Sequence, residues 1–404
     1  MKIVIVGAGQ AAASMAARLR TQGHEGEIVV IGAEPVAPYQ RPPLSKAYLL
    51  GRMDLDRLTL RAPDWWDDQG ITLRLGETAQ TVDPARRVVV TDRGKIAYDA
   101  LALTTGASAR RLPAAMGGNL PGVHVIRTLA DVDALAPVMQ RGRRLIVIGG
   151  GYIGLEAAAV ARKLDLSVTV IEAAPRILGR VAALETADMI RALHQAHGVD
   201  ILEGTGISHI TGTDRATGVA LIDGRDLPAD LPADLIVTGI GVLPETALAQ
   251  TAGLVLDNGI ATDALGRTSD PAIWAAGDCA SFPWDGGRLR LESVGNAIDM
   301  AEAVADNILG ANQPYHPKPW FWSDQFDAKL QIAGLGTGHD RIVTRAGDGQ
   351  HGGSVWYFRQ GRLIAVDALN DARAYMIGKR LIEAGRSPDP DRIAATTDLK
   401  SLLA

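Results

Sequence analysis

The sequence predicts an α/β protein with two Rossmann-like dinucleotide-binding domains and a small C-terminal α+β domain. The glycine signature GAGQAA at residues 7–12 recurs as GGGYIG at residues 149–154, and each copy separates an apolar β-branched run from a small-residue stretch. The order of strand, glycine turn and helix is the beginning of a βαβ unit. The tail from about residue 319 has a different texture, with the apolar and polar alternation of antiparallel strands.

The first βαβ unit begins near the first residue. Residues 2–6, KIVIV, predict a strand that is buried on both faces. A small-residue helix follows over residues 10–23, and EIVVIGAE at residues 27–34 predicts the second strand. A right-handed crossover makes this unit half of a nucleotide-binding sheet.

The turn of this unit has the residues that a dinucleotide fingerprint needs. Gly7 makes the tight turn, Gly9 lets the backbone approach a pyrophosphate, and Ala12 lets the helix pack closely on the strand. Glu34 ends the second strand, where a carboxylate accepts hydrogen bonds from ribose hydroxyls. The alternative is a glycine turn selected for packing alone.

Residues 143–174 repeat the same order independently. Gly149, Gly151 and Gly154 form the second turn, and Glu172 is its acidic residue. A carboxylate there favours a free 2′-hydroxyl over a 2′-phosphate, which predicts NADH rather than NADPH.

Two basic residues soften the expected preference for NADH. Arg176 and Arg180 lie just downstream of the second acidic residue. Two dinucleotide sites in one chain indicate one bound cofactor and one exchanging substrate. The usual pairing is FAD with NAD(P)H, in which hydride passes from the nicotinamide to the flavin.

The remaining segments predict a third strand and the C-terminal domain. Residues 233–280 contain a strand that ends at Gly277 and Asp278 and leads towards another helix, with Cys279 at its head. Residues 352–370 alternate like an antiparallel hairpin, and a helix is expected near residues 372–384. The direct repeat LPADLPADL at residues 227–235 is expected to be a loop or hairpin end without a function.

Composition excludes several classes of protein. The chain has 404 residues, a net charge of −5 and 47% hydrophobic residues, so nothing global points to nucleic acid or an anionic membrane as a partner. Because Cys279 is the single cysteine, no intrachain disulfide forms and enzymes that need a cysteine pair are excluded. With a strand beginning at the second residue we expect no signal peptide, and no apolar run reads as a membrane span, so the expected location is the cytoplasm.

Seven segments carry a resemblance to a known family over essentially the whole chain. They are PYQRPPLSKAYL, LALTTGA, VIGGGYIGLE, ADLIVTGIGVLPETALAQTAGL, DNGIATDALGRTSDPAIWAAGDCA, RLESVGNA and PWFWSDQFDAKLQIAG. Together they resemble the FAD-dependent NADH:ferredoxin reductases of bacterial monooxygenase and dioxygenase systems, the putidaredoxin-reductase-like family with a glutathione-reductase-like fold. RPPLSK and PWFWSDQ are specific to this branch.

The resemblance implies a split flavin domain and a set of site residues. The FAD-binding domain would comprise residues 1–112 and 236–318, the NAD-binding domain residues 113–235, and the C-terminal domain residues 319–404. Residues that would contact FAD, or border the two dinucleotides, are Gly7, Gly9, Ala11, Ala12, Ala33, Glu34, Arg41, Lys46, Ala79, Arg127, Gly277, Asp278 and Val294, with Gly149, Gly151, Tyr152, Ile153, Gly154, Glu156, Glu172, Gly241, Glu292 and Trp322.

Three residues are implied to act near the flavin. Lys46 would pair with Glu156 close to the flavin N5, and a lone carboxylate beside apolar neighbours in a helix also calls for a partner. Trp322 would lie close to the flavin and shape the exit of electrons. The alternatives are an exposed helical glutamate for Glu156 and a core aromatic for Trp322.

The other candidates have structural explanations. Glu292 resembles a residue near the nicotinamide, with no independent support. We expect Cys279 to pack beneath the flavin rather than to react, and the HxxH spacing of His194 and His197 offers no third ligand for a metal site.

The resemblance implies that NADH delivers hydride to FAD and that electrons leave singly to a 2Fe-2S ferredoxin. Relatives that work through cysteine are disfavoured, since Ser45 stands nearest to the position where a single-cysteine enzyme has its thiol. NADH oxidase or rubredoxin reductase activity remains open, as does an NADH-sensing interaction protein like apoptosis-inducing factor. Docking of an acidic ferredoxin predicts a basic rim, for which the candidates are Arg61, Lys329, Arg359 and Arg362.

Overall fold

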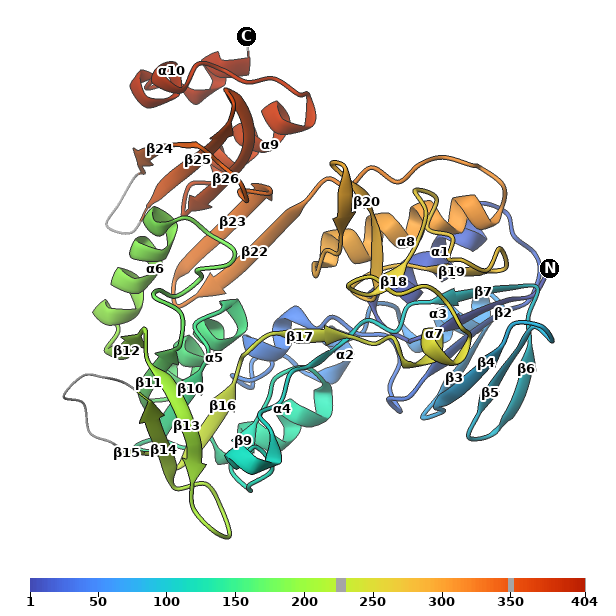
Figure 1. Cartoon of the computed structure of the whole chain (residues 1–404), viewed down its shortest axis with the longest axis horizontal. Coiled ribbons are helices and arrows are strands. Elements are labelled where there is room, and N and C mark those ends of the chain that lie inside the picture. The colour runs from blue at the N-terminus through green and yellow to red at the C-terminus, as the bar shows by residue number, and fades with distance from the viewer. Residues whose placement is uncertain (223–229, 348–351, 404) are drawn as a thin grey trace. The chain divides into compact units, whose positions relative to one another are not determined.

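Each glycine turn follows a strand of its own five-stranded parallel sheet, and the two sheets belong to separate units of the chain (Figure 1). The computed structural model describes residues 1–222, 230–347 and 352–403. The first unit comprises residues 1–41, 54–108 and 242–319, and the second comprises residues 42–53, 109–241 and 320–404.

The first sheet has the strand order β19-β7-β1-β2-β3, and neighbouring strands are parallel. Its central strands are buried on both faces, as their β-branched runs predict. The strands are β1 (Ile3–Val6), β2 (Ile28–Gly32), β3 (Ile71–Leu75), β7 (Ala100–Leu103) and β19 (Ile273–Ala275).

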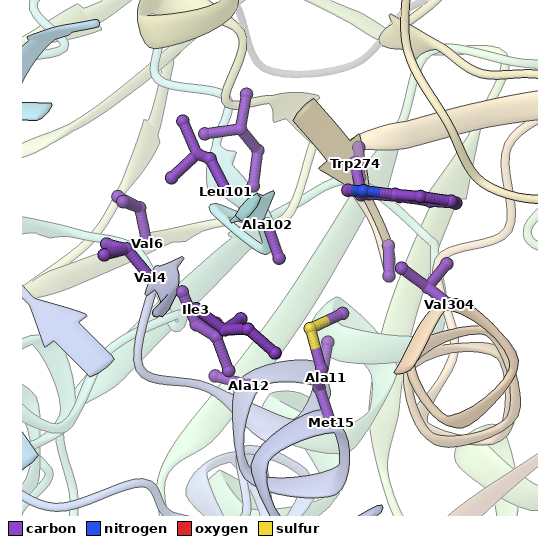
Figure 2. Packing of buried hydrophobic residues seen from close by; sticks show 14 of the residues in the cluster. Ile3, Val4, Val6, Ala11, Ala12, Met15, Leu101, Ala102, Trp274 and Val304 are labelled. Atoms are coloured by element: carbon purple, nitrogen blue, oxygen red, sulfur yellow. The ribbon is translucent and has the colours of Figure 1, made fainter. Parts of the chain in front are cut away.

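Helices α1 (Gln10–Thr21) and α8 (Val294–Ile308) pack against each other beside this sheet. Figure 2 shows apolar side chains from both helices and from β1, β7 and β19 in one cluster, with Met15 of α1 among them. Small residues of α1 such as Ala12 are fully buried, which permits the close helix-to-strand packing expected of the first fingerprint. An ion pair between Arg18 and Asp306 also joins the two helices, at 2.7 Å.

Shorter elements complete the first unit. A three-stranded antiparallel sheet has the order β4-β5-β6, and β18, β20 and β21 form another small sheet. The bounds are α2 (Leu55–Leu58), α3 (Pro63–Asp68), β4 (Ala79–Asp83), β5 (Val88–Thr91), β6 (Gly94–Ala97), β8 (Ala107–Ala109), β17 (Val242–Pro244), α7 (Ala247–Thr251), β18 (Ile260–Ala261), β20 (Ala280–Trp284) and β21 (Gly287–Leu289).

The second unit repeats the parallel design, with the strand order β12-β11-β10-β16-β9. Its βαβ unit consists of β10 (Arg144–Ile148), α5 (Tyr152–Lys163) and β11 (Ser167–Glu172). The other elements of this part are η1 (Pro42–Ser45), η2 (Ala114–Met116), β9 (Val123–His124), α4 (Leu129–Leu135), η3 (Ala136–Val138), α6 (Leu184–Ala196), β12 (Val199–Glu203), β13 (Gly206–Thr211), β14 (Gly218–Ile222), β15 (Asp230–Pro232) and β16 (Leu235–Thr238).

The C-terminal part of the second unit is an antiparallel sheet with the order β22-β23-β26-β25-β24. The alternating tail therefore forms strands, and α9 (Ala372–Glu383) is the helix expected after them. The remaining bounds are β22 (Trp320–Gln325), β23 (Ala328–Gly334), β24 (Arg341–Ala346), β25 (Gly353–Arg359), β26 (Arg362–Leu369), α10 (Pro390–Ala395) and η4 (Leu399–Leu403). The predicted fold class, two Rossmann-like domains with a C-terminal α+β part, is confirmed.

The units and elements differ in places from those expected from the sequence. The second unit includes residues 42–53, 109–112 and 236–241. Strand β16 is hydrogen-bonded between β10 and β9 of the parallel sheet of that unit. Gly277 and Asp278 lead into the strand β20 rather than directly into a helix, and the next helix begins at Val294.

The repeat LPADLPADL lies only partly within the described residues. Its first three residues, 227–229, fall outside them, whereas Asp230–Pro232 forms β15 and pairs with β14. Among the described residues, none of the helices combines the length and the apolar character that a bilayer crossing requires.

Candidate functional site

The first glycine turn connects β1 to α1. Gly7 has φ +106°, and a Cβ there would lie 2.2 Å from the carbonyl oxygen of Thr104, so only glycine fits. Gly9 is the N-cap residue of α1, and a Cβ added to it would have none of the described atoms within 4 Å. Packing within the unit therefore explains Gly7 but not Gly9. The open side of Gly9 suits a phosphate that approaches the N–H groups and the positive dipole end of α1.

The second turn, between β10 and α5, has the same two features. Gly149 has φ +107°, and a Cβ there would lie 2.4 Å from the carbonyl oxygen of Gly239. Gly151 is the N-cap of α5, and a Cβ added to it would meet its nearest described neighbour at 4.0 Å. Both 12-residue helices thus present a glycine N-terminus to an open space, which fits two dinucleotide pyrophosphates.

The acidic residue of the first unit already has partners in its own unit. Glu34 accepts hydrogen bonds from Arg41 Nη2 and from the hydroxyl of Tyr39, each at 2.7 Å. Arg41 was expected beside the cofactor, and here it binds the carboxylate expected to hold the ribose. Each carboxylate oxygen has two acceptor sites, so Glu34 retains capacity for a ribose hydroxyl.

The acidic residue of the second unit holds its own glycine turn. Glu172 accepts from the backbone N–H of Gly150 and of Ala174, each at 2.7 Å. Arg176, one of the two basic residues downstream, donates to the backbone carbonyls of Ala182 and Ala183. This engagement directs the Arg176 guanidinium to the protein's own backbone, whereas Arg180 is exposed.

Glu156, in α5, forms the most deeply buried ion pair of the described residues of the second unit. Its side chain is 1% exposed, and its Oε2 lies 2.6 Å from Nζ of Lys46, a residue next to η1. Ser45 donates to the same oxygen at 2.5 Å, and Ser323 of β22 donates to Oε1 at 2.6 Å. The expected contact between Lys46 and Glu156 is therefore present, and both residues belong to the second unit.

Burial and pairing oppose each other at this carboxylate. Burial, the larger effect, raises the pKa of Glu156, while the Lys46 ammonium and the hydrogen bonds from Lys46, Ser323 and Ser45 act to lower it. Moving a carboxylate out of water costs free energy. The attraction of one cation and the hydrogen bonds of two hydroxyl donors offset this cost only where their geometry is good. Perturbed groups of this kind cluster at functional sites.

Strand β22, which supplies Ser323, also carries three aromatic side chains. Trp322 stacks on Trp320 with ring centroids 5.5 Å apart, and Phe321 contacts Tyr152 at 4.7 Å. Trp322 is half-buried, so its ring is neither a fully buried core residue nor a fully exposed one. Because neighbouring residues of a strand point to opposite faces, the ring of Trp322 lies on the face of β22 opposite Ser323.

The residues expected at the dinucleotides are divided between the units as follows. The first unit holds Gly7, Gly9, Ala11, Ala12, Ala33, Glu34, Arg41, Ala79, Gly277, Asp278, Glu292 and Val294. The second unit holds Lys46, Arg127, Gly149, Gly151, Tyr152, Ile153, Gly154, Glu156, Glu172, Gly241 and Trp322. Val294 begins α8 as expected, and Glu292 is 42% exposed and pairs with Arg290 at 2.7 Å.

Cys279 is a packing residue and does not begin a helix. It is fully buried just before β20, and its Sγ donates to the carbonyl oxygens of Leu103 and Ala276. Burial, as the largest effect, raises the pKa of this thiol. The expectation of a helix head at Cys279 is wrong, because residues 280–284 extend into a strand.

The two histidines have partners of their own. His194 is buried and its Nε2 lies 2.7 Å from Oε1 of Gln325, while Nδ1 of His197 contacts the carbonyl oxygen of Leu193. Within residues 1–222, 230–347 and 352–403, no group of three or more metal-ligating side chains comes together.

Sequence reasoning missed Ser45, Ser323 and Gln325. In the sequence, Ser45 stands out only as the residue in place of a reactive cysteine. Ser323 and Gln325 are two apart in β22 and both are buried, so they share one face of the strand. The signal available in the sequence was this pair of polar residues at strand spacing after an aromatic run.

The fold and the two open glycine turns define a class: an α/β protein with two separate dinucleotide-binding turns. Comparison with known proteins agrees. The pattern of the pyridine nucleotide-disulphide oxidoreductase family matches residues 1–301, and that of the reductase C-terminal family matches residues 320–403.

Individual relatives cover nearly the whole chain. The ferredoxin reductase subunit of 5,5′-dehydrodivanillate O-demethylase from Sphingobium sp. is 43% identical over 99% of this chain and 98% of its own. A rubredoxin-NAD(+) reductase from Ectopseudomonas oleovorans is 38% identical over 92% of this chain and 96% of its own. The crystal structure of a covalent putidaredoxin reductase–putidaredoxin complex matches with a TM-score of 0.94 and 38% identity, covering 100% of this chain and 98% of that one.

The chain belongs to the pyridine nucleotide-disulphide oxidoreductase family, in its branch of ferredoxin reductases. It is an oxidoreductase that uses FAD and a pyridine nucleotide.

Proposed function

We propose that this enzyme takes electrons from NADH and passes them through FAD, one at a time, to a 2Fe-2S ferredoxin that supplies a cytochrome monooxygenase or a ring-hydroxylating dioxygenase. The observation that supports it best is the pair of open glycine turns in a chain whose single thiol is buried. Two dinucleotides are accommodated and no dithiol relay is available, so electrons leave to an external carrier. When bound, FAD would accept two electrons together and release them one at a time.

The site residues follow from this proposal. The turn at Gly7 and Gly9 holds the FAD pyrophosphate, and the turn at Gly149 and Gly151 holds that of NADH. Lys46, paired with Glu156, contributes a charge-compensated pair beside the isoalloxazine. The protein binds and orients the two dinucleotides so that hydride passes from nicotinamide C4 to flavin N5. We assign no side chain as a proton donor or acceptor for the transfer, since hydride transfer needs none.

The preference for NADH is supported by the surroundings of Glu172. A 2′-phosphate would meet the negative charge of this carboxylate, which two backbone N–H groups hold in place. Because Arg176 donates to backbone carbonyls, Arg180 is left as the nearby basic side chain for such a phosphate. We infer a preference for NADH that is set chiefly by one charge.

Removing the negative charge of Glu172 tests the preference for NADH over NADPH. Glu172→Gln removes the repulsion, while its amide oxygen still accepts from one of the two backbone N–H groups. The ratio of kcat/KM for NADPH to that for NADH should therefore rise roughly tenfold, about 1.4 kcal/mol. Stopped-flow reduction of the flavin by each nucleotide measures it. Arg176→Gln serves as a control and should leave the ratio unchanged. An unaltered ratio in Glu172→Gln would contradict the assignment.

The carrier is tested with the same preparation. Reduction of cytochrome c by NADH is measured with the enzyme alone, with an added 2Fe-2S ferredoxin from an oxygenase system, and with added rubredoxin. Rubredoxin is included because one relative is a rubredoxin-NAD(+) reductase. We expect ferredoxin to accelerate the reaction strongly and rubredoxin weakly. A flavin that NADH cannot reduce would refute the proposed function, whereas preference for rubredoxin would reassign the carrier.

A further inference from the structure

The carboxylate of Glu156 is the end of a buried hydrogen-bonded chain that runs through the second unit. Ser323 Oγ donates to Glu156 Oε1 at 2.6 Å, and Gln325 Nε2 donates to Ser323 Oγ at 3.0 Å. The Oε1 atom of Gln325 lies 2.7 Å from Nε2 of His194. Four side chains from α5, β22 and α6 are thereby connected without a break.

The strand geometry explains why the chain forms. Ser323 and Gln325 are i and i+2 in β22, so both side chains point to the same face, and they are 0% and 1% exposed. Strand β22 packs on α5, which carries Glu156. The ring of His194 completes the chain from α6 and is itself fully buried.

The chain has a single direction. The Gln325 amide donates with its nitrogen and accepts with its oxygen, so the ring of His194 must donate through Nε2–H. A neutral ring has only one N–H, and Nδ1 of His194 has no hydrogen-bond partner among the described atoms. Burial lowers the pKa of His194 to about 4, so the ring is neutral at physiological pH. Every donor along the chain therefore points towards the carboxylate.

We propose that Ser323, Gln325 and His194 are positioning residues, which hold the Glu156 carboxylate ionised and aimed at Lys46. The inference rests on the proposed function, in which the pair of Lys46 and Glu156 lies at the flavin. It adds that the C-terminal part of the protein, through β22, sets the charge state of a group in the nucleotide-binding part of the same unit.

The energetics favour a functional reason for the chain. A well-packed apolar cluster is often at least as stable as a buried ion pair with its network, so stability alone does not call for these residues. A network aligned in one direction strengthens each of its bonds and stabilises negative charge at its end. The groups that act on Glu156 are Lys46 beside η1, Ser45 of η1, Ser323 of β22, and the neighbouring titratable side chain Tyr152 of α5.

Three substitutions and a matched control separate positioning from packing. Ser323→Ala removes the direct donor, Gln325→Leu removes the second link, and His194→Phe removes the third. The control, Ser354→Ala, deletes another buried serine hydroxyl of the same sheet. This hydroxyl accepts from Trp356 Nε1 and, among the described residues, has no hydrogen bond to any of the four connected side chains. Each is made in the full-length FAD-loaded protein.

The first readout is the pH profile of flavin reduction by NADH. Loss of a charge-assisted hydrogen bond raises the pKa of the carboxylate, so the acidic limb should move upward by about one pH unit in Ser323→Ala. Gln325→Leu and His194→Phe should move it by a few tenths, in decreasing order. Ser354→Ala should leave it in place. In a Glu156→Gln background, Ser323→Ala should cause no further movement, because no charge remains to be positioned.

The second readout does not depend on turnover. In protein labelled with ¹⁵N-histidine, the Nε2–H signal of His194 is assigned by its loss in His194→Phe. Ser323→Ala and Glu156→Gln should both shift this signal, and Ser354→Ala should not. An unshifted signal, or an acidic limb that moves no more in Ser323→Ala than in Ser354→Ala, would overturn the inference. Failure of the proposed function would be distinct, since the flavin of the unaltered protein would then not be reduced by NADH.

Discussion

Two buried carboxylates in the second unit differ in their partners: one is paired with a cation, and the other accepts hydrogen bonds from neutral hydroxyl groups. Glu156 has a cation, Lys46, within 2.6 Å. Asp367 in β26 is 2% exposed and accepts hydrogen bonds only from neutral groups among its described partners, Thr186 Oγ1 at 2.7 Å and the hydroxyl of Tyr357. Burial raises the pKa of Asp367 to about 6. Ionisation of Asp367 therefore opposes folding.

The sign of the resulting pH dependence follows from linkage. The folded-state pKa lies above that of the unfolded chain, so the stabilising contribution is complete below about pH 4 and is lost as the pH rises to about 6. A difference of about two units corresponds to about 3 kcal/mol. In Asp367→Asn this component should disappear. Hydrogen exchange of the amides in β25 and β26 at pH 4.5 and pH 7 measures the local free energy of opening.

A matched variant sharpens this measurement. Thr186→Val removes a donor that acts to lower the pKa of Asp367, so it should enlarge the loss of stability between pH 4.5 and pH 7 rather than reduce it. Equal pH dependence in the unaltered protein and in Asp367→Asn would show that Asp367 is not responsible.

At the scale of elements, the two glycine turns separate what packing requires from what a ligand requires. Gly7 and Gly149 are needed by the protein, because a Cβ at either would clash with a backbone carbonyl oxygen. Gly9 and Gly151 have backbone angles that alanine also adopts, and a Cβ at either has room. Under the proposed function, these second glycines leave room for the dinucleotide pyrophosphates.

Substitution of Gly151 by alanine tests this separation. We expect Gly151→Ala to lower the free energy of unfolding by no more than about 1 kcal/mol, the size of the penalty for alanine at an N-cap. The apparent Kd for NADH should rise by roughly tenfold or more, because the methyl group occupies the path of the pyrophosphate. Fluorescence titration with NAD⁺ and urea unfolding measure the two quantities.

The contrasting variant is Gly149→Ala. Its positive φ and the contact of 2.4 Å with the Gly239 carbonyl predict loss of stability together with loss of binding. Equal loss of stability in Gly151→Ala would show that the second glycine also serves packing.

At the scale of the whole molecule, the family name includes disulphide chemistry that this chain does not support. The single cysteine is buried in the first unit and donates to backbone carbonyls. We expect Cys279→Ala to retain NADH-driven reduction of the electron carrier within about twofold, because an inert buried thiol takes no part in transfer. Steady-state reduction of ferredoxin measures it.

Thiol titration is an independent check on the same point. Native protein should not react with an aromatic disulfide reagent, and the unfolded chain should release one equivalent. Rapid reaction of the native protein with loss of activity would contradict a packing role for Cys279.

The sequence by itself determined the two βαβ units, the turns at Gly7 and Gly149, the acidic residues Glu34 and Glu172, and the exclusion of a cysteine pair. These features are local in the chain, since strand, turn and helix are read from consecutive residues. The pairing of Lys46 with Glu156 was expected from a family resemblance and from the cost of an unpaired buried charge.

Only the tertiary structure decided what surrounds that pair. Ser45 and Ser323 reach Glu156 across 111 and 167 residues of sequence, and neither forms a motif with it. The sharing of the Glu34 carboxylate with Arg41, and the strand after Cys279, were likewise outside what local patterns convey. Hydrogen bonds are made in space, so which buried donors meet a carboxylate is settled when sheets and helices pack, and local sequence order does not record it.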